Sequence, residues 1–405
     1  MKILYFHQHF STPAGSGGTR SYEMARRLLA TGHQVTMICG SNSNSKTGVD
    51  SPFVRGKRRG FVDGIDVIEF NLPYGNKDRF LKRSFLFMKF ALRSIGVALR
   101  EPADIVFATS TPLTAAIPGL FAKWIRRKPF VFEVRDLWPE LPRAMGVITN
   151  PLVLWAMGAL EWVSYKSADR LIGLSPGIVD GIARNVPDCT KIALVPNGCD
   201  MDLFAADAEQ WRPEGVSDSD FMAVFTGTHG KANGLGAVID AAAILRARGT
   251  KGLKIVLVGD GAEKASLMER VKKEGLETIV IFHDPVPKAR LAGLMASADV
   301  GLQILANVPA FYYGTSPNKF FDYLAAGLPV LTNYPGWVAD IVEKHACGIA
   351  IPAANPELFA AGLTKLANTN KVDRKTMGAQ ARIVAADQFN RDYLFAKFSK
   401  HLLES

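Results

Sequence analysis

Residues 316–330 read Ser-Pro-Asn-Lys-Phe-Phe-Asp-Tyr-Leu-Ala-Ala-Gly-Leu-Pro-Val, and this segment decides the fold of the second half of the chain. It predicts a helix that begins after Pro317 and ends at Gly327, because proline suits the first turn of a helix and glycine its C-terminus. Pro329 then leads into an apolar strand at Val330. A helix followed at once by a buried strand is typical of parallel sheets that helices cover on both faces.

The same alternation of short apolar runs and helical patterns extends outward along the whole chain. It predicts strands at 3–6, 35–39, 67–70, 105–108, 130–134, 171–174 and 192–195, and then at 222–225, 255–258, 279–282, 300–304, 330–332 and 348–351. We therefore predict an α/β protein with two Rossmann-like, doubly wound parallel-sheet domains that face a cleft, where ligands bind at the carboxyl ends of the strands. The predicted domains span residues 1–198 and 199–385, and residues 386–405 form a C-terminal helix that can return to the first domain.

The net charge of +10 lies entirely in the first half of the chain, since residues 1–200 hold 26 Lys and Arg against 16 Asp and Glu. This asymmetry predicts an anionic partner such as a membrane surface, a phosphorylated acceptor or nucleic acid; the alternative is a charge that only aids solubility. The four cysteines are widely spaced, which favours a reducing compartment. The first residues lack a signal peptide and no apolar run is long enough to cross a bilayer, so we expect a cytoplasmic protein.

Two segments of the second half have the chemistry of a diphosphate site. Residues 227–234 read Gly-Thr-His-Gly-Lys-Ala-Asn-Gly after a predicted strand, and their backbone N–H groups and Lys231 suit a diphosphate. Lys319 falls near a helix N-terminus, where its ammonium and the helix dipole attract a phosphate. Asp322 lies one turn later on the same face, and its carboxylate can accept hydrogen bonds from two ribose hydroxyls. The alternative is a local ion pair between Lys319 and Asp322.

The first half carries two motifs at predicted strand ends. Residues 15–20 read Gly-Ser-Gly-Gly-Thr-Arg and predict a loop over a ligand, formed by Gly17, Gly18, Thr19 and Arg20, although a structural loop is the alternative. Residues 133–140 read Glu-Val-Arg-Asp-Leu-Trp-Pro-Glu directly after a buried strand. Ionisable side chains are costly to bury there unless they are used or paired, so Glu133, Arg135 and Asp136 are candidate functional residues or a local salt bridge. Asp200-Met-Asp202 has no third ligand nearby, and we interpret it as a turn and predict no metal site.

A basic, aromatic segment at residues 79–100 has six cations, no acid and three phenylalanines within six residues. This composition favours a helix lying in a membrane interface, with the arginines at 55–59 assisting. The alternative is an amphipathic helix that packs its phenylalanines on the sheet. The predicted membrane-facing side chains are Arg79, Lys82, Arg83, Phe85, Lys89, Phe90 and Arg93.

Over essentially its whole length, the chain resembles a family 4 glycosyltransferase of the GT-B fold. The resemblance rests on the segment from Asp322 to Val330 and on Asn197-Gly198 before Asp200, and it gives Asp322 the role of the ribose-binding carboxylate. The chain departs from the family at Gly314, where a glutamate is usual, at Thr228 and Asn233, where an arginine and a lysine bind the diphosphate, and at Arg135, where a histidine is usual. The motifs at 135–140 and 316–319 are similar to a bacterial branch that includes N-acetyl-L-fucosamine transferases.

The resemblance implies retaining transfer of a sugar from a UDP-sugar to a polyprenyl-diphosphate-linked saccharide in O-antigen or capsule synthesis, at the inner face of the cytoplasmic membrane and without nucleic acid. Lys319, Arg135 and Asp136 are the expected catalytic residues, and fixed cations take the place of a metal or other cofactor. The expected donor-binding residues are Asp322, Asn318, Ser316, Gly227, Thr228, Lys231 and Gly314; Gly17, Gly18, Thr19, Arg20 and Glu133 are expected on the acceptor side. The alternatives are a UDP-sugar epimerase of the same fold and a non-enzymatic, two-lobed sugar-binding protein.

Overall fold

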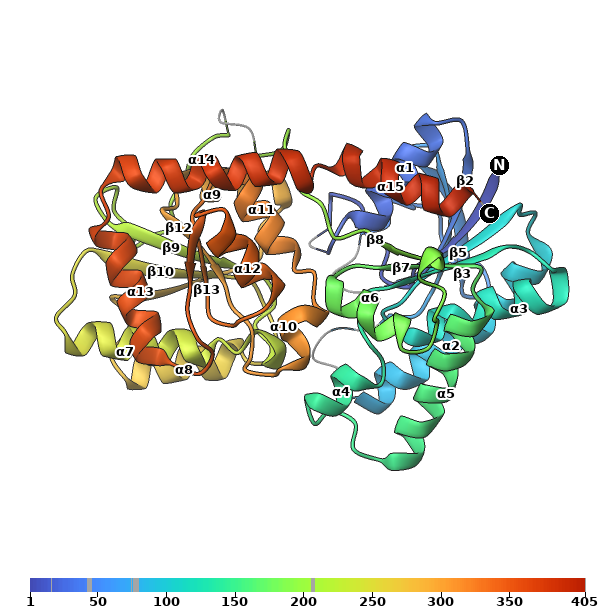
Figure 1. Cartoon of the computed structure of the whole chain (residues 1–405), viewed down its shortest axis with the longest axis horizontal. Coiled ribbons are helices and arrows are strands. Elements are labelled where there is room, and N and C mark those ends of the chain that lie inside the picture. Colours follow the sequence, from blue (N-terminus) through green and yellow to red (C-terminus); the bar gives the residue numbers. More distant parts are fainter. Residues whose placement is uncertain (16, 42–45, 74, 76–79, 205–207, 405) are drawn as a thin grey trace. The chain divides into compact units, whose positions relative to one another are not determined.

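The computed structural model describes residues 1–15, 17–41, 46–73, 75, 80–204 and 208–404 (Figure 1). The chain forms two compact units. Unit 1 comprises Met1–Pro196, Gly314–Ser316 and Asp392–Ser405, and unit 2 comprises Asn197–Tyr313 and Pro317–Arg391. Each unit contains one large, mainly parallel sheet with helices around it, which confirms the predicted α/β class with two parallel-sheet domains.

The sheet of unit 1 has eight strands in the order β3-β4-β2-β1-β5-β6-β7-β8. All neighbours are parallel except β3, which runs antiparallel to β4. The central strand β1 sets the register, with Ile3 opposite Val35 on one side and Ile105 on the other. The strands are β1 (Lys2–Phe6), β2 (Gln34–Gly40), β3 (Lys57–Val62), β4 (Ile65–Phe70), β5 (Ile105–Thr109), β6 (Phe130–Val134), β7 (Arg170–Gly173) and β8 (Ile192–Leu194).

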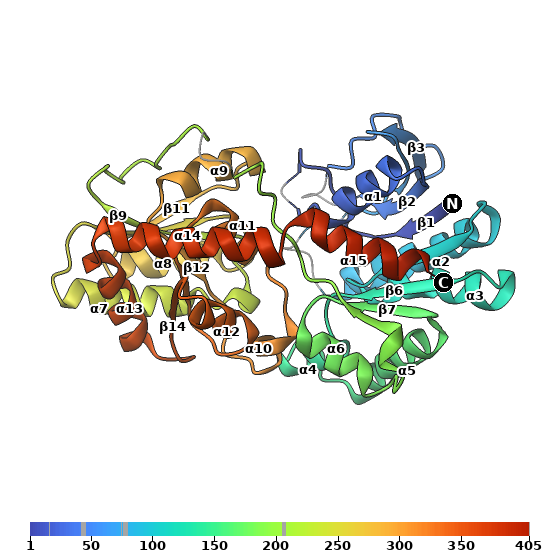
Figure 2. The same ribbon diagram turned by 45° about the horizontal axis from the view of Figure 1, so that its top comes forward.

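The helices of unit 1 cover both faces of this sheet. Right-handed crossovers place α2, α3, α5 and α6 on one face and α1 on the other (Figure 1). From Asp392 onward α15, red in Figure 2, also belongs to unit 1. The ring of Phe398 on this helix packs 5.2 Å from that of Phe107 on β5. The helices are α1 (Arg20–Ala30), α2 (Phe80–Arg100), α3 (Ile117–Arg126), α4 (Glu140–Ala144), α5 (Pro151–Ser167), α6 (Pro176–Ala183) and α15 (Arg391–Leu403), with short 3-10 turns η1 (Leu113–Ala116) and η2 (Cys189–Lys191).

The edge strand β3 was not predicted, because its sequence Lys-Arg-Arg-Gly-Phe-Val lacks an apolar run. Arg58 pairs with Glu69 at 2.9 Å, and Arg59 pairs with Asp66 at 2.6 Å. These contacts involve two of the four cations of residues 55–59, the basic segment that was predicted to assist membrane binding. Two of its cations are neutralised by acids on β4, so the segment serves as a charged edge that discourages pairing with other chains.

The sheet of unit 2 has six parallel strands in the order β11-β10-β9-β12-β13-β14. Each apolar run predicted in this half overlaps one of them. The strands are β9 (Phe221–Thr226), β10 (Leu253–Val258), β11 (Val280–His283), β12 (Val300–Gln303), β13 (Val330–Thr332) and β14 (Gly348–Ala350). The helices are α7 (Gly236–Ala247), α8 (Lys264–Lys273), α9 (Lys288–Ser297), α10 (Ala310–Gly314), α11 (Asn318–Ala326), α12 (Trp337–Lys344), α13 (Pro356–Asn368) and α14 (Lys371–Gln388), with a 3-10 turn η3 (Lys231–Asn233).

Helix α11 follows the prediction made from residues 316–330. It begins directly after Pro317 and ends at Gly327, which adopts a left-handed conformation with φ of 69°. Since a side chain is disfavoured in that conformation, the glycine fixes where the helix stops and where β13 begins.

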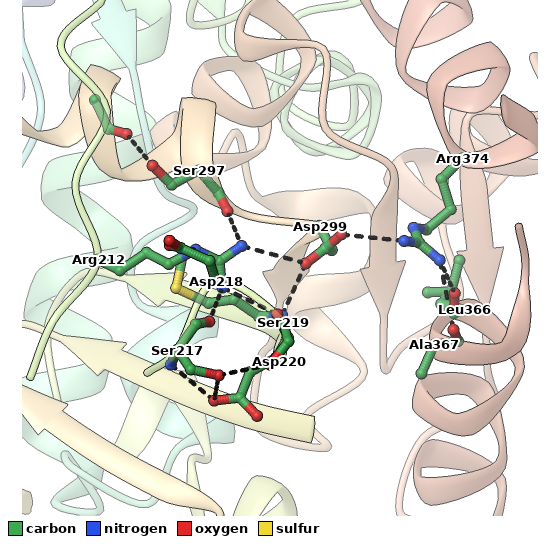
Figure 3. Close-up of polar contacts among 12 residues, drawn as sticks. Arg212, Ser217, Asp218, Ser219, Asp220, Ser297, Asp299, Leu366, Ala367 and Arg374 are labelled. Carbon is green, nitrogen blue, oxygen red and sulfur yellow. Dashed lines mark hydrogen bonds and ion pairs between the residues drawn. The ribbon is translucent and has the colours of Figure 1, made fainter. Parts of the chain in front are cut away.

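A polar network holds the opposite, amino-terminal end of this sheet (Figure 3). Asp299 accepts a hydrogen bond from the backbone N–H of Met222 at 2.9 Å and pairs with Arg374 of α14 at 3.2 Å. Arg212 donates to the carbonyls of Asp220 and Ser297 at 2.9 and 2.8 Å. The network attaches the segment before β9 and helix α14 to the amino-terminal end of the sheet. Its residues do not take part in the carboxyl-terminal ends of the strands, where ligands bind in sheets of this kind.

Within the residues that the structure describes, no helix is both long enough and apolar enough to span a bilayer.

Candidate active site

Two glycine turns at the carboxyl ends of β9 and β10 form the floor of the site in unit 2. Gly227 follows β9 and Gly259 follows β10, both with positive φ, of 146° and 152°. A Cβ atom on Gly259 would lie 1.8 Å from the carbonyl oxygen of Gly227, so only glycine permits this approach. The turns are joined where the N–H of His229 donates to the carbonyl of Asp260 at 3.0 Å. The result is a close-packed backbone surface of the kind that suits a phosphate.

Lys319, the second residue of α11, lies against this surface. Its Nζ donates to Oδ1 of Asn233 at 2.6 Å and lies 4.4 Å from the centre of the Phe225 ring. Its side chain also lies beside Gly227, where a Cβ would approach Lys319 Cε to 3.3 Å. Burial lowers the pKa of Lys319 to about 7, because the site gives its ammonium no carboxylate. An anion bound there would favour the charged form.

Asp322, one turn further along α11, pairs with a residue that the sequence did not indicate. Its Oδ1 lies 3.3 Å from Nζ of Lys288, the first residue of α9. The alternative of a local ion pair between Lys319 and Asp322 is therefore wrong: each has a partner on another element. Lys288 follows Pro287 at a helix start, much as Lys319 follows Pro317, and that parallel is the signal from which it could have been found.

The other predicted donor-binding residues are placed as follows. Thr228 and Lys231 are exposed in the loop after β9, where the side chain of Asn233 donates to the carbonyl of Thr228 at 2.7 Å. Asn318 is exposed at the start of α11. Gly314, the last residue of α10, and Ser316 are grouped with unit 1.

His229, in the middle of the first glycine turn, was not predicted as a site residue. It is fully buried, and neither ring nitrogen has a hydrogen-bond partner among the described residues. Burial, with the nearby charge of Lys264, lowers its pKa to about 4. The imidazole is thus neutral at physiological pH. One of its ring nitrogens is then a hydrogen-bond donor and the other an acceptor within the turn.

In unit 1, a buried charge cluster lies where β5 and β6 end. The carboxylate of Glu133 accepts from Arg20 at 2.8 Å, from Thr109 at 2.8 Å and from Arg135 at 3.2 Å. Burial alone would raise the pKa of Glu133, but the two guanidinium groups outweigh it and lower that pKa. The carboxylate is thereby held ionised between two cations.

This cluster corrects the prediction that Arg20 and Glu133 contact an acceptor. Arg20 also donates to the carbonyls of Val195 and Pro196 at 3.0 and 2.6 Å, and Glu133 is wholly buried. Their polar atoms are occupied inside the protein, so the pair orients neighbouring groups and ties the end of β8 to α1.

Arg135 and Asp136 stand at the edge of this cluster. Arg135 donates to Thr109 at 2.6 Å and to Ser21 at 2.9 Å. Asp136 accepts from Thr111 at 3.1 Å, and burial raises its pKa. Arg135 thus forms an ion pair with Glu133, and its charge partly offsets the effect of burial on the pKa of Asp136.

Comparison with known proteins matches both halves of the chain to families. Residues 15–198 match the Glycosyl transferase 4-like domain, and residues 220–369 match Glycosyl transferases group 1. The protein is a glycosyltransferase. An uncharacterized glycosyltransferase of Methanocaldococcus jannaschii is 23% identical over 353 residues, which cover 85% of this chain and 83% of that protein.

Solved glycosyltransferase structures share its fold. Anabaena HepE, in complex with UDP and glucose, is 17% identical, covers 100% of both chains and has a TM-score of 0.72. WaaG, a glycosyltransferase involved in lipopolysaccharide biosynthesis, is also 17% identical, covers 100% of both chains and has a TM-score of 0.70. These similarities establish that the glycosyltransferase has the GT-B fold.

Buried polar side chains directly after β1 of this glycosyltransferase were also not predicted from the sequence. His7 and Gln8 are almost fully buried, and Nδ1 of His7 and both amide atoms of Gln8 have no hydrogen-bond partner within the described part of the chain. Burial lowers the pKa of His7 well below its usual range and that of His9 to about 3. The run His-Gln-His at the end of a buried strand was the available signal.

The loop from β1 to α1 positions the remaining predicted acceptor-side residues. Gly17, Gly18 and Thr19 precede the first turn of α1, where backbone N–H groups have no partner within the helix.

In the segment Asp200-Met-Asp202, Asp200 pairs with Arg391 at 3.9 Å. Across the described ranges, no three His, Cys, Asp or Glu side chains are grouped as ligands for a metal ion.

Helix α2 carries most of the predicted membrane-facing residues, and the structure divides them. Phe90 is wrong as a membrane contact, since it is fully buried in the core. Arg93 donates to the carbonyl of Gly56 at 3.0 Å. Phe85 is exposed with Lys89 beside its ring, Lys82 is exposed and Arg83 is half-buried. Arg79 lies outside the described residues.

Proposed function

We propose that this glycosyltransferase moves a sugar from a UDP-sugar, with retention of configuration, to a polyprenyl-diphosphate-linked saccharide at the inner face of the cytoplasmic membrane. The product would be part of a surface polysaccharide such as O-antigen or capsule. The donor we propose is UDP-N-acetyl-L-fucosamine, on the resemblance of residues 135–140 and 316–319 to that branch. The observation that carries the proposal is the placement of Lys319 at the N-terminus of α11, against the turn at Gly227.

The geometry of unit 2 supports a nucleoside diphosphate. The glycine turns offer backbone N–H groups, Lys319 offers one cation and the N-terminus of α11 adds its dipole. Asp322 lies one helical turn beyond Lys319, and its carboxylate can accept hydrogen bonds from the ribose hydroxyls. The similar structures of HepE with UDP and glucose add support for a UDP-sugar.

The chemistry that follows is stabilisation of a leaving group. In retaining transfer, the bond between the sugar and the diphosphate breaks as the acceptor hydroxyl attacks from the same face. Negative charge develops on the departing oxygen, and fixed groups that neutralise it lower the barrier most. Lys319 and the loop amides supply this neutralisation, so we propose a reaction that needs no metal or other cofactor.

Unit 1 offers groups for the acceptor. The guanidinium of Arg135, held by Thr109 and Ser21, can bind an acceptor oxygen or phosphate. Asp136, with its raised pKa, and the neutral imidazoles of His7 and His9 can exchange a proton with the acceptor hydroxyl. Gly17, Gly18 and Thr19 would close over it as a loop.

Helix α2 supports the membrane part of the proposal through one of its faces. Leu81, Phe85, Met88 and Leu92 recur at intervals of four, three and four residues and are all exposed. That spacing places them in one outward stripe, opposite the buried face with Leu86 and Phe90. Cations beside an exposed apolar stripe suit an anionic interface.

One assay tests the proposal against its two rivals. Purified enzyme is incubated with radiolabelled UDP-sugars, with and without a polyprenyl-diphosphate-linked saccharide, in the presence of EDTA. Label in the lipid fraction only when acceptor is present supports transfer. Conversion of the UDP-sugar to its epimer without acceptor would favour the epimerase, and binding without any conversion would favour a sugar-binding protein. Loss of transfer on adding EDTA would assign the charge neutralisation to a metal.

Two variants locate the transfer chemistry. Lys319→Ala should lower kcat more than it raises KM, because the charge it neutralises develops in the transition state. Lys251→Ala, which removes an exposed lysine before β10 at the opposite end of the sheet, is the matched control and should change kcat much less. If both variants lowered kcat equally, Lys319 would not be the residue that neutralises charge in the transition state.

A further inference from the structure

Helix α5 is an apolar helix that the fold leaves uncovered. Its first ten residues, Pro-Leu-Val-Leu-Trp-Ala-Met-Gly-Ala-Leu, carry no charge. Leu152 is 75% exposed, Trp155 is 73% exposed and Trp162, two residues beyond this run, is 52% exposed. Helices that are apolar all round are normally buried, so this one is expected to be covered by something.

The deepest contacts of α5 with its own unit lie toward its C-terminal end, where Leu160 and Val163 pack against the core. Ser164 and Tyr165 are its only fully buried residues in the part of the chain described. Tyr165 donates to Glu161 at 2.9 Å, and its ring lies 6.3 Å from that of Phe132 on β6. The N-terminal two-thirds of the helix therefore exposes Leu152, Val153 and Trp155, whose side chains lie outside the core of unit 1.

The helices α3 and α2, on the same face of the sheet as α5, also expose apolar side chains. Helix α3 contacts both α5 and α2 and exposes Trp124 and Ile125 on the same face of the sheet. Helix α2 adds the stripe of Leu81, Phe85, Met88 and Leu92. Three helices on one face of unit 1 thus expose large apolar side chains, three tryptophans among them.

Charge identifies what covers this face. Residues 79–100, 105–132 and 141–160 contain no Asp or Glu, whereas they hold six, four and one Lys or Arg. These three stretches are acid-free and basic, and the first acid of α5, Glu161, follows them beside Trp162. A surface with a cationic excess and exposed tryptophans complements an anionic lipid interface, where indole rings sit at the level of the headgroups. A second copy of the chain would bring a surface of the same sign and be repelled.

We infer that α5 is a membrane-inserting element, whose N-terminal two-thirds enters the headgroup region of an anionic bilayer beside α2 and α3. The inference rests on the proposed function, in which the acceptor is lipid-linked, and deepens it by naming the inserted element. Trp155 and Leu152 supply apolar contact, and the cations of α2 and α3 supply attraction to lipid headgroups. The contribution of α5 should therefore resist salt, whereas that of the cations should not.

Vesicle sedimentation with the full chain tests the inference. Vesicles of phosphatidylcholine with phosphatidylglycerol are compared for the wild type, for Leu152→Glu with Trp155→Glu, and for Val372→Glu, a control at a residue of α14 that is 72% exposed. The α5 variant should bind about tenfold or more weakly at both low and high salt, because charge replaces inserted apolar surface. The control should bind as the wild type does. Equal binding by the α5 variant and the wild type would overturn the inference.

Two further measurements keep the test decisive. Brominated lipids should quench the fluorescence of the wild type, and Trp155→Phe, which conserves the fold, should lose much of that quenching; unchanged quenching in Trp155→Phe would overturn the inference. Sedimentation without lipid identifies the rival occupant: a dimer that the Leu152→Glu change converts to a monomer would show that a second copy covers α5, and would also overturn it.

The proposed function is tested separately, by transfer to a short-chain, water-soluble acceptor. Wild type and α5 variant should be equally active there. If neither the wild type nor the α5 variant transfers sugar but the vesicle results are as expected, the proposed function is wrong and the membrane insertion of α5 is still supported.

Discussion

The carboxylate of Asp322 and the ammonium of Lys288 form an ion pair between α11 and α9, with Oδ1 3.3 Å from Nζ. Lys288 also lies 5.8 Å from the ring of Phe204, so its side chain is held from two sides. The carboxylate that we propose as the acceptor of ribose hydroxyls is therefore oriented by a cation.

This ion pair predicts that substitutions of Asp322 and of Lys288 affect UDP binding to different degrees. Asp322→Ala should weaken UDP binding by about 1–3 kcal/mol, since hydrogen bonds between the ribose and a charged group are lost. Lys288→Ala should weaken binding less, because the carboxylate remains and only its orientation is relaxed. Isothermal titration calorimetry on both variants measures the difference. Unchanged UDP affinity in folded Asp322→Ala would refute the role of the carboxylate.

The network around Asp299 predicts a loss of stability. Asp299→Ala leaves the N–H of the fully buried Met222 without its acceptor and removes the partner of Arg374. The free energy of unfolding should fall by about 2–4 kcal/mol, because a buried donor and a partly buried cation lose their partners together. Urea denaturation measures this loss. Asp218→Ala is the control, since Asp218 is exposed and 4.0 Å from Arg212; a matching loss in both variants would contradict the prediction.

Much of the fold could be predicted from the sequence because its strands are continuous apolar runs. Runs such as Ile255–Val258 are buried on both faces in a parallel sheet, so hydrophobicity alone marks them. The edge strand β3 was not predicted because an edge strand needs no apolar run. Its arginines are stabilised by acids seven or more residues away in sequence, such as Asp66 and Glu69.

The candidate site was only partly predictable. Lys319 could be placed, because the proline before it and the glycine after it fix the ends of α11. Lys288 could not, since its contact with Asp322 depends on how α9 packs against α11. The burial of Arg20 was likewise invisible, because its partners Glu133 and Pro196 are brought to it by the tertiary structure.

The buried cluster in unit 1 predicts an acid-sensitive contribution to stability. The folded-state pKa of Glu133 is lowered, so its stabilisation is present above the unfolded-state value of about 4.3 and is lost as pH falls through the folded-state value. Glu133→Gln leaves Arg20 and Arg135 without their carboxylate and should cost about 3–5 kcal/mol at neutral pH.

Thermal unfolding between neutral pH and about pH 3 checks this prediction. The difference between wild type and Glu133→Gln should narrow in acid, as Glu133 of the wild type becomes protonated. Glu140→Gln is the control, because Glu140 forms an exposed ion pair with Arg184 at 3.3 Å and should contribute little. Equal unfolding midpoints for wild type and Glu133→Gln at neutral pH would disprove the role of the cluster.

The lowered pKa of Lys319 predicts that diphosphate binding takes up a proton. In the free protein this pKa is about 7, so the charged fraction of Lys319 falls as pH rises through that value. A bound diphosphate favours the ammonium and raises the pKa. The affinity for UDP should then fall about tenfold for each pH unit above 7, until the pKa of the complex is reached. His229 does not titrate in this range, because its pKa is about 4.

Calorimetry at about pH 8 in buffers with different ionisation enthalpies should detect uptake of nearly one proton per UDP bound by the wild type. Lys319→Arg provides the matched variant, since a guanidinium keeps its charge throughout this range. Its affinity should be nearly independent of pH, and binding should take up no proton. If the wild type showed a flat profile, or if Lys319→Arg retained the same slope, the titrating group would lie elsewhere and Lys319 would not be the cation that meets the diphosphate.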